Sequence, residues 1–140
     1  MERRRFFTRL GATAIALLAS APLMANTLKT SKRNKRRGAL KKEQVQHMVI
    51  FDLQYEKGSE LALKFLNDGQ KILSNISGVK NFQVFKQVSV KNDFTYGFSM
   101  VFGCKADYEA YSNHPDHLGF VENRWKKEVS RFQEIDFKTF

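Results

Sequence analysis

The most regular alternation of apolar and other residues in the chain is Phe94-Thr95-Tyr96-Gly97-Phe98-Ser99-Met100-Val101-Phe102. A period of two is typical of a β-strand, because successive side chains of a strand point to opposite faces of the sheet. A turn signal, Lys91-Asn92-Asp93, precedes this stretch, and a second apolar run over residues 79–90 lies before the turn. The two runs predict a β-hairpin at the centre of the fold.

The sequence on either side of the hairpin predicts two more strands and three helices. Residues 45–55 alternate as a strand, with His47 on its apolar face. Ser59 is a typical helix N-cap, apolar residues recur after it at helical spacing, and Ser77-Gly78 ends that helix. The remaining elements are a short helix over 106–111, a His114-Pro115 capping pair, a helix over 118–129 and a strand over 132–140.

The resulting order, βαββααβ, predicts an α+β fold with a ferredoxin-like antiparallel sheet that carries its helices on one face. The chain holds 13 Phe residues, and apolar side chains occur on both faces of the expected strands. A second copy of the chain would cover the face that lacks helices. We therefore expect a homodimer that closes two sheets into an α/β barrel.

The net charge of +10 belongs to the N-terminal part of the chain. Residues 1–42 contain 12 of the 24 Lys and Arg residues but only one of the 14 acidic residues. The remaining 12 basic and 13 acidic residues give residues 43–140 a net charge of −1. A nearly neutral domain argues against nucleic acid as a partner. The single cysteine, Cys104, excludes an internal disulfide and is expected to act as a small apolar residue.

The N-terminus resembles a twin-arginine export signal. Arg3 and Arg4 are followed, one residue later, by Phe6 and Phe7, and then by an uncharged stretch over residues 10–25. Such a stretch is too short to span a hydrocarbon core of about 30 Å comfortably. Residues 1–25 are therefore interpreted as a signal peptide, which predicts a periplasmic or extracellular protein with no stable membrane span after cleavage.

Two alternatives to cleavage after residue 25 remain open. Leu23 is larger than the ideal residue near a cleavage site, so an uncleaved membrane anchor is one alternative. Translation from a start near Met24 is the other. Residues 26–43 are rich in basic residues and lack aromatic ones, which predicts a disordered linker before the folded domain at 44–140. We favour a solvated spacer over an electrostatic tether to an anionic surface.

The motif Tyr-x-x-His-Pro-x-His, at Tyr111, His114 and His117, carries a family resemblance. Together with the strand opening at 45–51 and the segment Tyr96-Gly97-Phe98, it resembles the stress-responsive A/B barrel (Dabb) family over nearly all of residues 45–140. The resemblance implies a dimeric α+β barrel with a cavity between sheet and helices in each protomer. Most family members have no assigned activity, and a fold does not by itself confer one.

One member type, the plant olivetolic acid cyclase, closes a linear polyketide by an intramolecular aldol condensation. By motif position, the resemblance implies His117 as general base, Tyr111 as the group that orients or polarises the substrate, and His47 behind them. An imidazole can remove a proton α to a carbonyl near neutral pH, and a phenol can donate to the developing enolate oxygen. This chemistry needs no cofactor, and none is expected. The further pocket or structural residues are His114, Phe51, Tyr96, Phe98, Phe120 and Trp125.

Three functions follow from these residues. The first is a pocket that binds a small carbonyl or phenolic molecule and acts on it by acid/base chemistry, as a polyketide-cyclase-like lyase does. The second is a non-catalytic stress-response or assembly protein. The third is a metal- or haem-related ferredoxin-like monooxygenase, in which His47, His114 and His117, with Asp116 nearby, hold a metal. The proline between His114 and His117 arranges them poorly for this, so no metal site is predicted.

Each of the three site residues also has a purely structural interpretation. His47 can be a buried, hydrogen-bonded histidine on an apolar strand. Tyr111 can be part of the core. The ring N–H of His117 can anchor its helix to a strand carbonyl.

Overall fold

The computed structural model describes residues 39–140. The predicted signal peptide, with Arg3, Arg4, Phe6 and Phe7, and the linker up to residue 38 lie outside the described residues. The described part forms one four-stranded antiparallel sheet with the strand order β2-β3-β1-β4. The strands are β1 (Val45–Leu53), β2 (Lys80–Lys86), β3 (Tyr96–Phe102) and β4 (Val129–Phe137).

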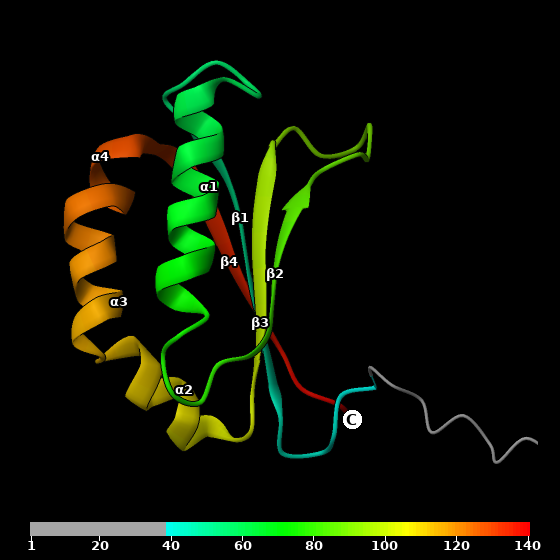
Figure 1. Ribbon diagram of the computed structural model, residues 1–140. Helices are drawn as coiled ribbons and strands as arrows, with labels where there is room; N and C mark the ends of the chain where they lie inside the picture. The colour runs from blue at the N-terminus through cyan, green and yellow to red at the C-terminus, as the bar shows by residue number, and fades with distance from the viewer. Residues whose placement is uncertain (1–38) are drawn as a thin grey trace, which may run out of the picture. The chain divides into compact units, whose positions relative to one another are not determined.

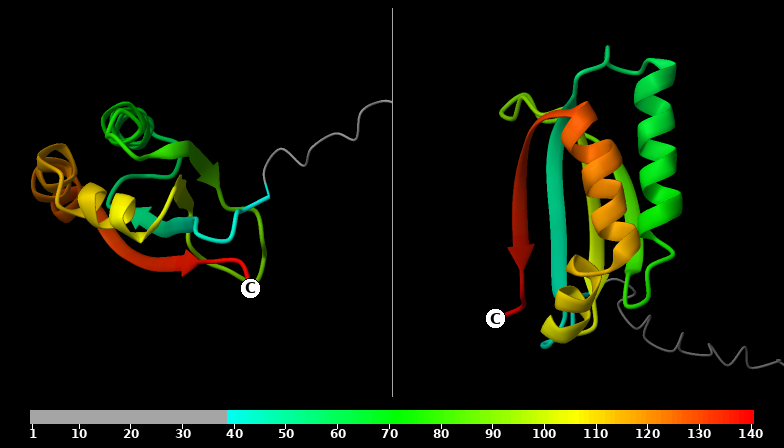
Figure 2. Two further views of the ribbon diagram at one scale, coloured as in Figure 1. Left: turned by 90° about the horizontal axis from the view of Figure 1, so that it is seen from below. Right: turned by 90° about the vertical axis from the view of Figure 1, so that its left-hand side faces the viewer.

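The helices lie on one face of this sheet (Figure 1; Figure 2, left). They are α1 (Glu60–Leu73), α2 (Lys105–Ser112), α3 (Pro115–Phe120), a π-helical turn η1 (Val121–Trp125) and the short α4 (Lys126–Glu128). The arrangement confirms the predicted ferredoxin-like α+β fold. Within residues 39–140, no helix combines the length and the apolar character needed to cross a membrane.

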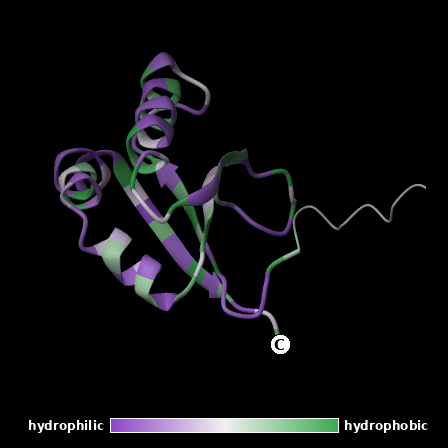
Figure 3. Ribbon diagram, turned by 60° about the horizontal axis from the view of Figure 1, so that its bottom comes forward, coloured by the Kyte–Doolittle hydropathy of each residue, from purple (hydrophilic) through white to green (hydrophobic). Residues whose placement is uncertain are grey.

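Local sequence signals explain most of the first half of the domain, although α1 ends at Leu73, with Ser74 as its C-cap, before the predicted end at Ser77-Gly78. Every second residue of β1, from Val45 to Leu53, is buried, which is the pattern of a strand with one face against a core. The hydroxyl of Ser59 accepts the backbone N–H of Ala62 at 3.3 Å and so caps α1. Hydrophobic and hydrophilic residues are interleaved along the elements (Figure 3).

The core between sheet and helices is mainly aromatic. Phe51, at the centre of β1, has no exposed surface, and its ring centroid lies 4.9 Å from that of Phe98 and 5.9 Å from that of Phe65. Full burial of one such side chain contributes about 1.5–3 kcal/mol. The largest fully buried side chains are Phe51, Phe65, Phe98, Phe102 and Met100.

A glycine in α1 sets how closely this helix approaches the sheet. A Cβ atom on Gly69 would lie 2.8 Å from Cζ of Phe98 and 3.1 Å from Cζ of Phe120. Both distances are shorter than normal carbon–carbon contacts of about 3.5–4.0 Å. The missing side chain therefore allows α1 to pack directly on these two rings.

The central hairpin is shorter than predicted. β2 ends at Lys86, which pairs with Tyr96, and residues 87–95 form a loop instead of a tight turn at 91–93. Val88 and Val90 are 89% and 100% exposed. The alternation of Val88 and Val90 continues here without a strand, because β3 begins its pairing with β2 and β1 only at Tyr96.

The C-terminal helix and strand also begin earlier than predicted. α3 starts at Pro115 instead of residue 118, because the ring Nδ1 of His114 accepts the backbone N–H of Asp116 at 3.2 Å and caps the helix there. The predicted helix runs without a break through η1 and α4, and β4 begins at Val129 instead of residue 132. The capping pair itself is confirmed.

Candidate functional site

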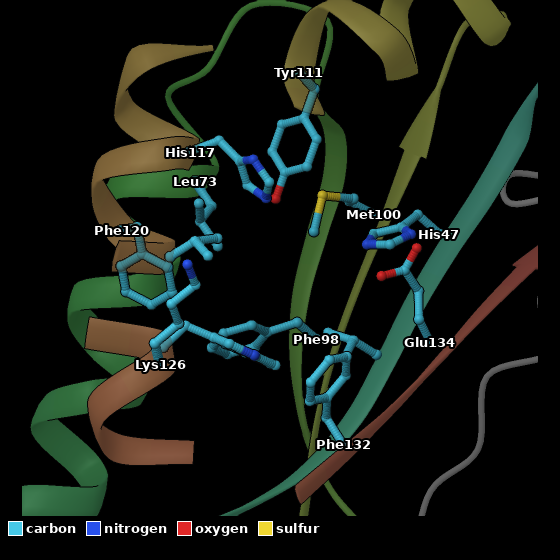
Figure 4. Close-up of a pocket in the computed structure, with 13 residues that line it drawn as sticks. His47, Leu73, Phe98, Met100, Tyr111, His117, Phe120, Lys126, Phe132 and Glu134 are labelled. Carbon is cyan, nitrogen blue, oxygen red and sulfur yellow. The ribbon is translucent and has the colours of Figure 1, made fainter. Parts of the chain in front are cut away.

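A cavity of about 280 Å³ lies between the sheet and the helices (Figure 4). This volume suits a molecule of about one ring, since small-molecule sites usually measure about 300–1,000 Å³. Most of the lining is apolar. The lining residues are His47, Val49, Leu73, Phe98, Met100, Tyr111, His117, Phe120, Val121, Trp125, Lys126, Phe132 and Glu134.

On the helix side, Tyr111 of α2 and His117 of α3 meet at the corner between their helices. Their ring centroids are 4.4 Å apart, and Nδ1 of His117 lies 3.0 Å from the backbone carbonyl oxygen of Ser112. A carbonyl oxygen only accepts hydrogen bonds, so Nδ1 carries a proton and donates it. The other nitrogen of the neutral ring, Nε2, then has a free lone pair. His117 thus lines the pocket, and its ring is also anchored. Its partner is a carbonyl oxygen of α2, whereas the sequence suggested a carbonyl oxygen of a strand.

The environment of this pair favours a neutral base beside a neutral donor. Burial lowers the pKa of His117 below its ordinary value of 6.5, the charges of His47 and His114 lower it further, and the contact with Ser112 and the charge of Glu134 partly oppose this. Burial also raises the pKa of the Tyr111 hydroxyl, and the negative charge of Glu134 adds to the effect. His117 is therefore a neutral base near pH 7, and Tyr111 keeps its proton.

The Tyr111 hydroxyl is available to a ligand. Tyr111 is only 3% exposed, and it lines the cavity. Figure 4 shows it beside the His117 ring. A phenol hydroxyl can donate one hydrogen bond to an acceptor of a ligand in the cavity.

On the strand side, His47 contacts two acidic residues of β4. His47 is 7% exposed, and its Nδ1 donates to Oδ1 of Asp136 at 2.7 Å. The hydroxyl of Tyr108 lies 3.0 Å from Oε1 of Glu134 and 3.2 Å from Oδ2 of Asp136. Burial and these two carboxylates raise the pKa of Tyr108. His47 is therefore hydrogen-bonded and also faces the pocket.

Sequence reasoning missed Glu134 and Asp136. The signal that could have found them is their spacing, because Phe132, Glu134 and Asp136 alternate along one face of the last strand. Their place beside His47 depends on the pairing of β4 with β1, in which His47 lies directly opposite Asp136.

Of the other predicted residues, some line the pocket and the rest lie in the core or cap a helix. Phe98, Phe120 and Trp125 line the pocket. Phe51 and Tyr96 do not, and lie in the core instead, where the Tyr96 hydroxyl accepts the backbone N–H of Gly58 at 2.9 Å. His114 caps α3 and also stays outside the lining.

The three-histidine metal site considered from the sequence does not form. In residues 39–140, one group of three or more His, Cys, Asp or Glu side chains brings its ligand atoms within 4.8 Å of one another, and it consists of His47, Glu134 and Asp136. His114 is excluded because its ring turns back to cap its own helix.

The π-helical turn η1 shapes the mouth of the pocket. It is followed directly by Lys126, and both Trp125 and Lys126 line the cavity. Lys126 forms an ion pair with Glu122, one turn earlier. Such turns are frequent at functional sites.

An antiparallel four-stranded sheet, helices on one face and a histidine-containing pocket between them define a ferredoxin-like barrel domain. The family model described as Stress responsive A/B Barrel Domain (Dabb) matches residues 45–139, and the chain belongs to this family. A crystal structure of a Dabb family protein with a ferredoxin-like fold from Mesorhizobium loti is 43% identical. That match has a TM-score of 0.69 and covers 70% of this chain and 98% of the other.

More distant structures share the fold alone. A dimeric protein of unknown function from Bacteroides fragilis is 18% identical, with a TM-score of 0.54 and coverage of 69% of this chain and 96% of the other. A hydroxynitrile lyase from Passiflora edulis is 13% identical, with a TM-score of 0.62 and coverage of 71% and 96%. Several similar structures are described as dimeric. A comparison with curated proteins gives no significant match.

Proposed function

We propose that the pocket binds a small, mainly hydrophobic molecule with a carbonyl or phenolic group, and that His117 acts on it as a general base. The observation that carries this proposal is the contact between Nδ1 of His117 and the Ser112 carbonyl oxygen at 3.0 Å, which leaves Nε2 as the basic nitrogen. A buried, neutral imidazole with a fixed tautomer is suited to proton abstraction near neutral pH.

The chemistry requires only this chain's own residues. Nε2 of His117 takes the proton from the carbon next to the carbonyl, the electron pair of the broken C–H bond forms a C=C bond, and the π pair of the C=O bond moves onto the carbonyl oxygen. The hydroxyl of Tyr111 donates a hydrogen bond to that oxygen as its negative charge develops. The protonated His117 then returns its proton to carbon, or the enolate attacks a second carbonyl group of the same molecule in an aldol closure and His117 gives its proton to the alkoxide that forms there.

The apolar lining supports a hydrophobic substrate. Phe98, Phe120 and Trp125 provide flat surfaces for a ring. The hydroxynitrile lyase from Passiflora edulis shows that an enzyme can be built on this fold, but at 13% identity its reaction is not transferred to this chain.

The test uses 2,4-dihydroxyacetophenone as a probe, because it combines phenol groups, a carbonyl and exchangeable α-protons. Binding is measured by calorimetry, and exchange of the α-protons in D₂O by NMR. We expect His117→Ala to abolish binding or to lower the exchange rate by about 10²–10⁴-fold, with little change in melting temperature. Tyr111→Phe keeps the ring and should lower the rate without loss of the fold.

The matched control is His114→Ala, since His114 belongs to the same motif but stays outside the pocket lining. It removes the cap of α3 and a small influence on the pKa of His117, so it should lower binding and exchange far less than His117→Ala does. If His117→Ala exchanges as fast as wild type, or if it mainly unfolds the protein, the pocket proposal is wrong. The non-catalytic alternative would then be preferred.

We further propose that the protein is exported by the twin-arginine route and works as a homodimer in the periplasm or outside the cell. Arg3, Arg4, Phe6 and Phe7 support the first part, and the apolar residues of residues 1–25 fit a signal peptide. Replacement of Arg3 and Arg4 by lysine should block export of the full chain. Efficient export of this variant would exclude the twin-arginine route.

A further inference from the structure

We propose that His47, Glu134 and Asp136 bind one divalent transition-metal ion at the strand side of the pocket. One ligand atom from each residue is available, and these atoms all lie within 4.8 Å of one another. The proposal does not depend on the base chemistry proposed for His117, because it rests on another set of residues.

The ligands come from two paired strands, which hold them rigidly. His47 on β1 lies directly opposite Asp136 on β4, and Glu134 is two residues earlier on the same face of β4. Sites built on paired strands position ligands more accurately than sites on loops. Binding of the ion would replace the hydrogen bond between His47 and Asp136: Nδ1 of His47 would release its proton to solvent, and its lone pair would turn to the ion together with one oxygen from each carboxylate.

The charge around this cluster favours a cation. Glu134 and Asp136 place two carboxylates at one point, and in the described part of the chain their only ion pair is that of Asp136 with His47. Tyr108 approaches both carboxylates but has a single hydroxyl proton for them. A divalent ion would neutralise both carboxylates at once.

The cluster is accessible from two directions. Glu134 and Asp136 are exposed to solvent, whereas His47 and Glu134 line the pocket. Figure 4 shows the His47 ring and the Glu134 carboxylate side by side at one side of the cavity. With three protein ligands, the ion would keep open positions for water or for a ligand in the cavity.

The ligand types select the class of metal. Mg²⁺ and Ca²⁺ prefer sites made of oxygen alone, whereas an imidazole with two carboxylates suits Mn²⁺, Fe²⁺, Co²⁺ or Zn²⁺. Tyr108 would act as a positioning residue that orients the carboxylates through its hydroxyl.

The experiment uses the full chain without an affinity tag, stripped with a chelator and titrated with CoCl₂. Calorimetry measures the stoichiometry, and visible absorption reports the coordination of Co²⁺. We expect one Co²⁺ per chain, displaced by Zn²⁺ but not by excess Mg²⁺. Glu134→Gln and Asp136→Asn should each weaken binding by about tenfold or more.

The control variant is His114→Ala, which removes a more exposed histidine outside the cluster and should bind Co²⁺ as wild type does. Melting temperatures check that the Gln and Asn variants, which keep side-chain shape, remain folded. Failure to bind one Co²⁺ per chain would overturn the proposal. So would unchanged binding in Glu134→Gln, or displacement by Mg²⁺ as effective as by Zn²⁺.

Discussion

The two sides of the pocket use the same residue type in opposite surroundings. On the helix side, His117 contacts a neutral backbone carbonyl, and burial lowers its pKa. On the strand side, His47 contacts the carboxylate of Asp136, with Glu134 nearby. The comparison teaches that the partner of Nδ1 decides what an imidazole can do. His117, bonded to a carbonyl oxygen, is prepared as a base, whereas His47, bonded to a carboxylate, is part of an anionic cluster.

The largest effect is expected at Phe98, which lines the pocket between its two sides. Phe98 is 1% exposed, lines the pocket and contacts Gly69 of α1. Phe98→Ala should lower the free energy of unfolding by about 3–5 kcal/mol, through lost burial and a new cavity. Urea denaturation measures this. Val88→Ala, at a position that is 89% exposed, is the control and should change stability by less than about 0.5 kcal/mol. Equal changes in the two variants would show that Phe98 is not packed as described.

The next effect concerns the close packing of α1 on Phe98 and Phe120. Gly69→Ala should destabilise the protein by about 1–3 kcal/mol, because the added methyl group meets the rings of Phe98 and Phe120. In an exposed helix position the same change would instead stabilise by about 1 kcal/mol. The sign of the change in the urea midpoint separates the two cases, and a gain in stability would contradict the close approach of α1.

A smaller effect sharpens the contrast between the two histidines. The folded-state pKa of His117 lies below 6.5, so its neutral form contributes stability that is present above this value and is lost as the pH falls toward the folded pKa. Three charged groups act on the pKa of His117: His47 of β1, Glu134 of β4 and His114 at the corner between α2 and α3. His117→Gln should therefore show a shallower loss of stability between about pH 7.5 and about pH 5 than wild type.

The control for this pH dependence is His114→Gln, whose parent side chain is 37% exposed. Because His114 is the smallest of the influences on the pKa of His117, this variant should change the slope of unfolding free energy against pH much less than His117→Gln does. An unchanged slope in His117→Gln would mean that His117 is not buried as a neutral ring.

The smallest effect is expected on the outer surface of α2, away from both sides of the pocket. Lys105 and Glu109 form an exposed ion pair at 3.2 Å. Lys105→Ala should change the free energy of unfolding by less than about 0.5 kcal/mol, because exposed pairs contribute little. A larger change would indicate that this surface is coupled to the pocket.

Local signals in the sequence predicted the elements that depend on neighbouring residues. The alternation of 45–53, the cap at Ser59 and the His114-Pro115 pair all act within a few residues. The motif also assigned Tyr111 and His117 to one site, and the structure has their ring centroids 4.4 Å apart.

Features that depend on distant residues could not be predicted in this way. The place of Asp136 beside His47 follows from strand pairing across 89 positions of the chain. The early end of β2 depends on where its neighbouring strands stop, and the need for glycine at residue 69 depends on rings from β3 and α3. Periodicity within a segment contains none of this information.

The central claim is that His117 is a neutral imidazole with its proton on Nδ1 and a free lone pair on Nε2. Two-bond ¹⁵N–¹H correlation NMR of the full chain at neutral pH reads this tautomer directly, with His117→Gln to assign the signals. The account predicts a protonated Nδ1 and an unprotonated Nε2 for His117. A proton on Nε2, or a doubly protonated ring at neutral pH, would contradict it.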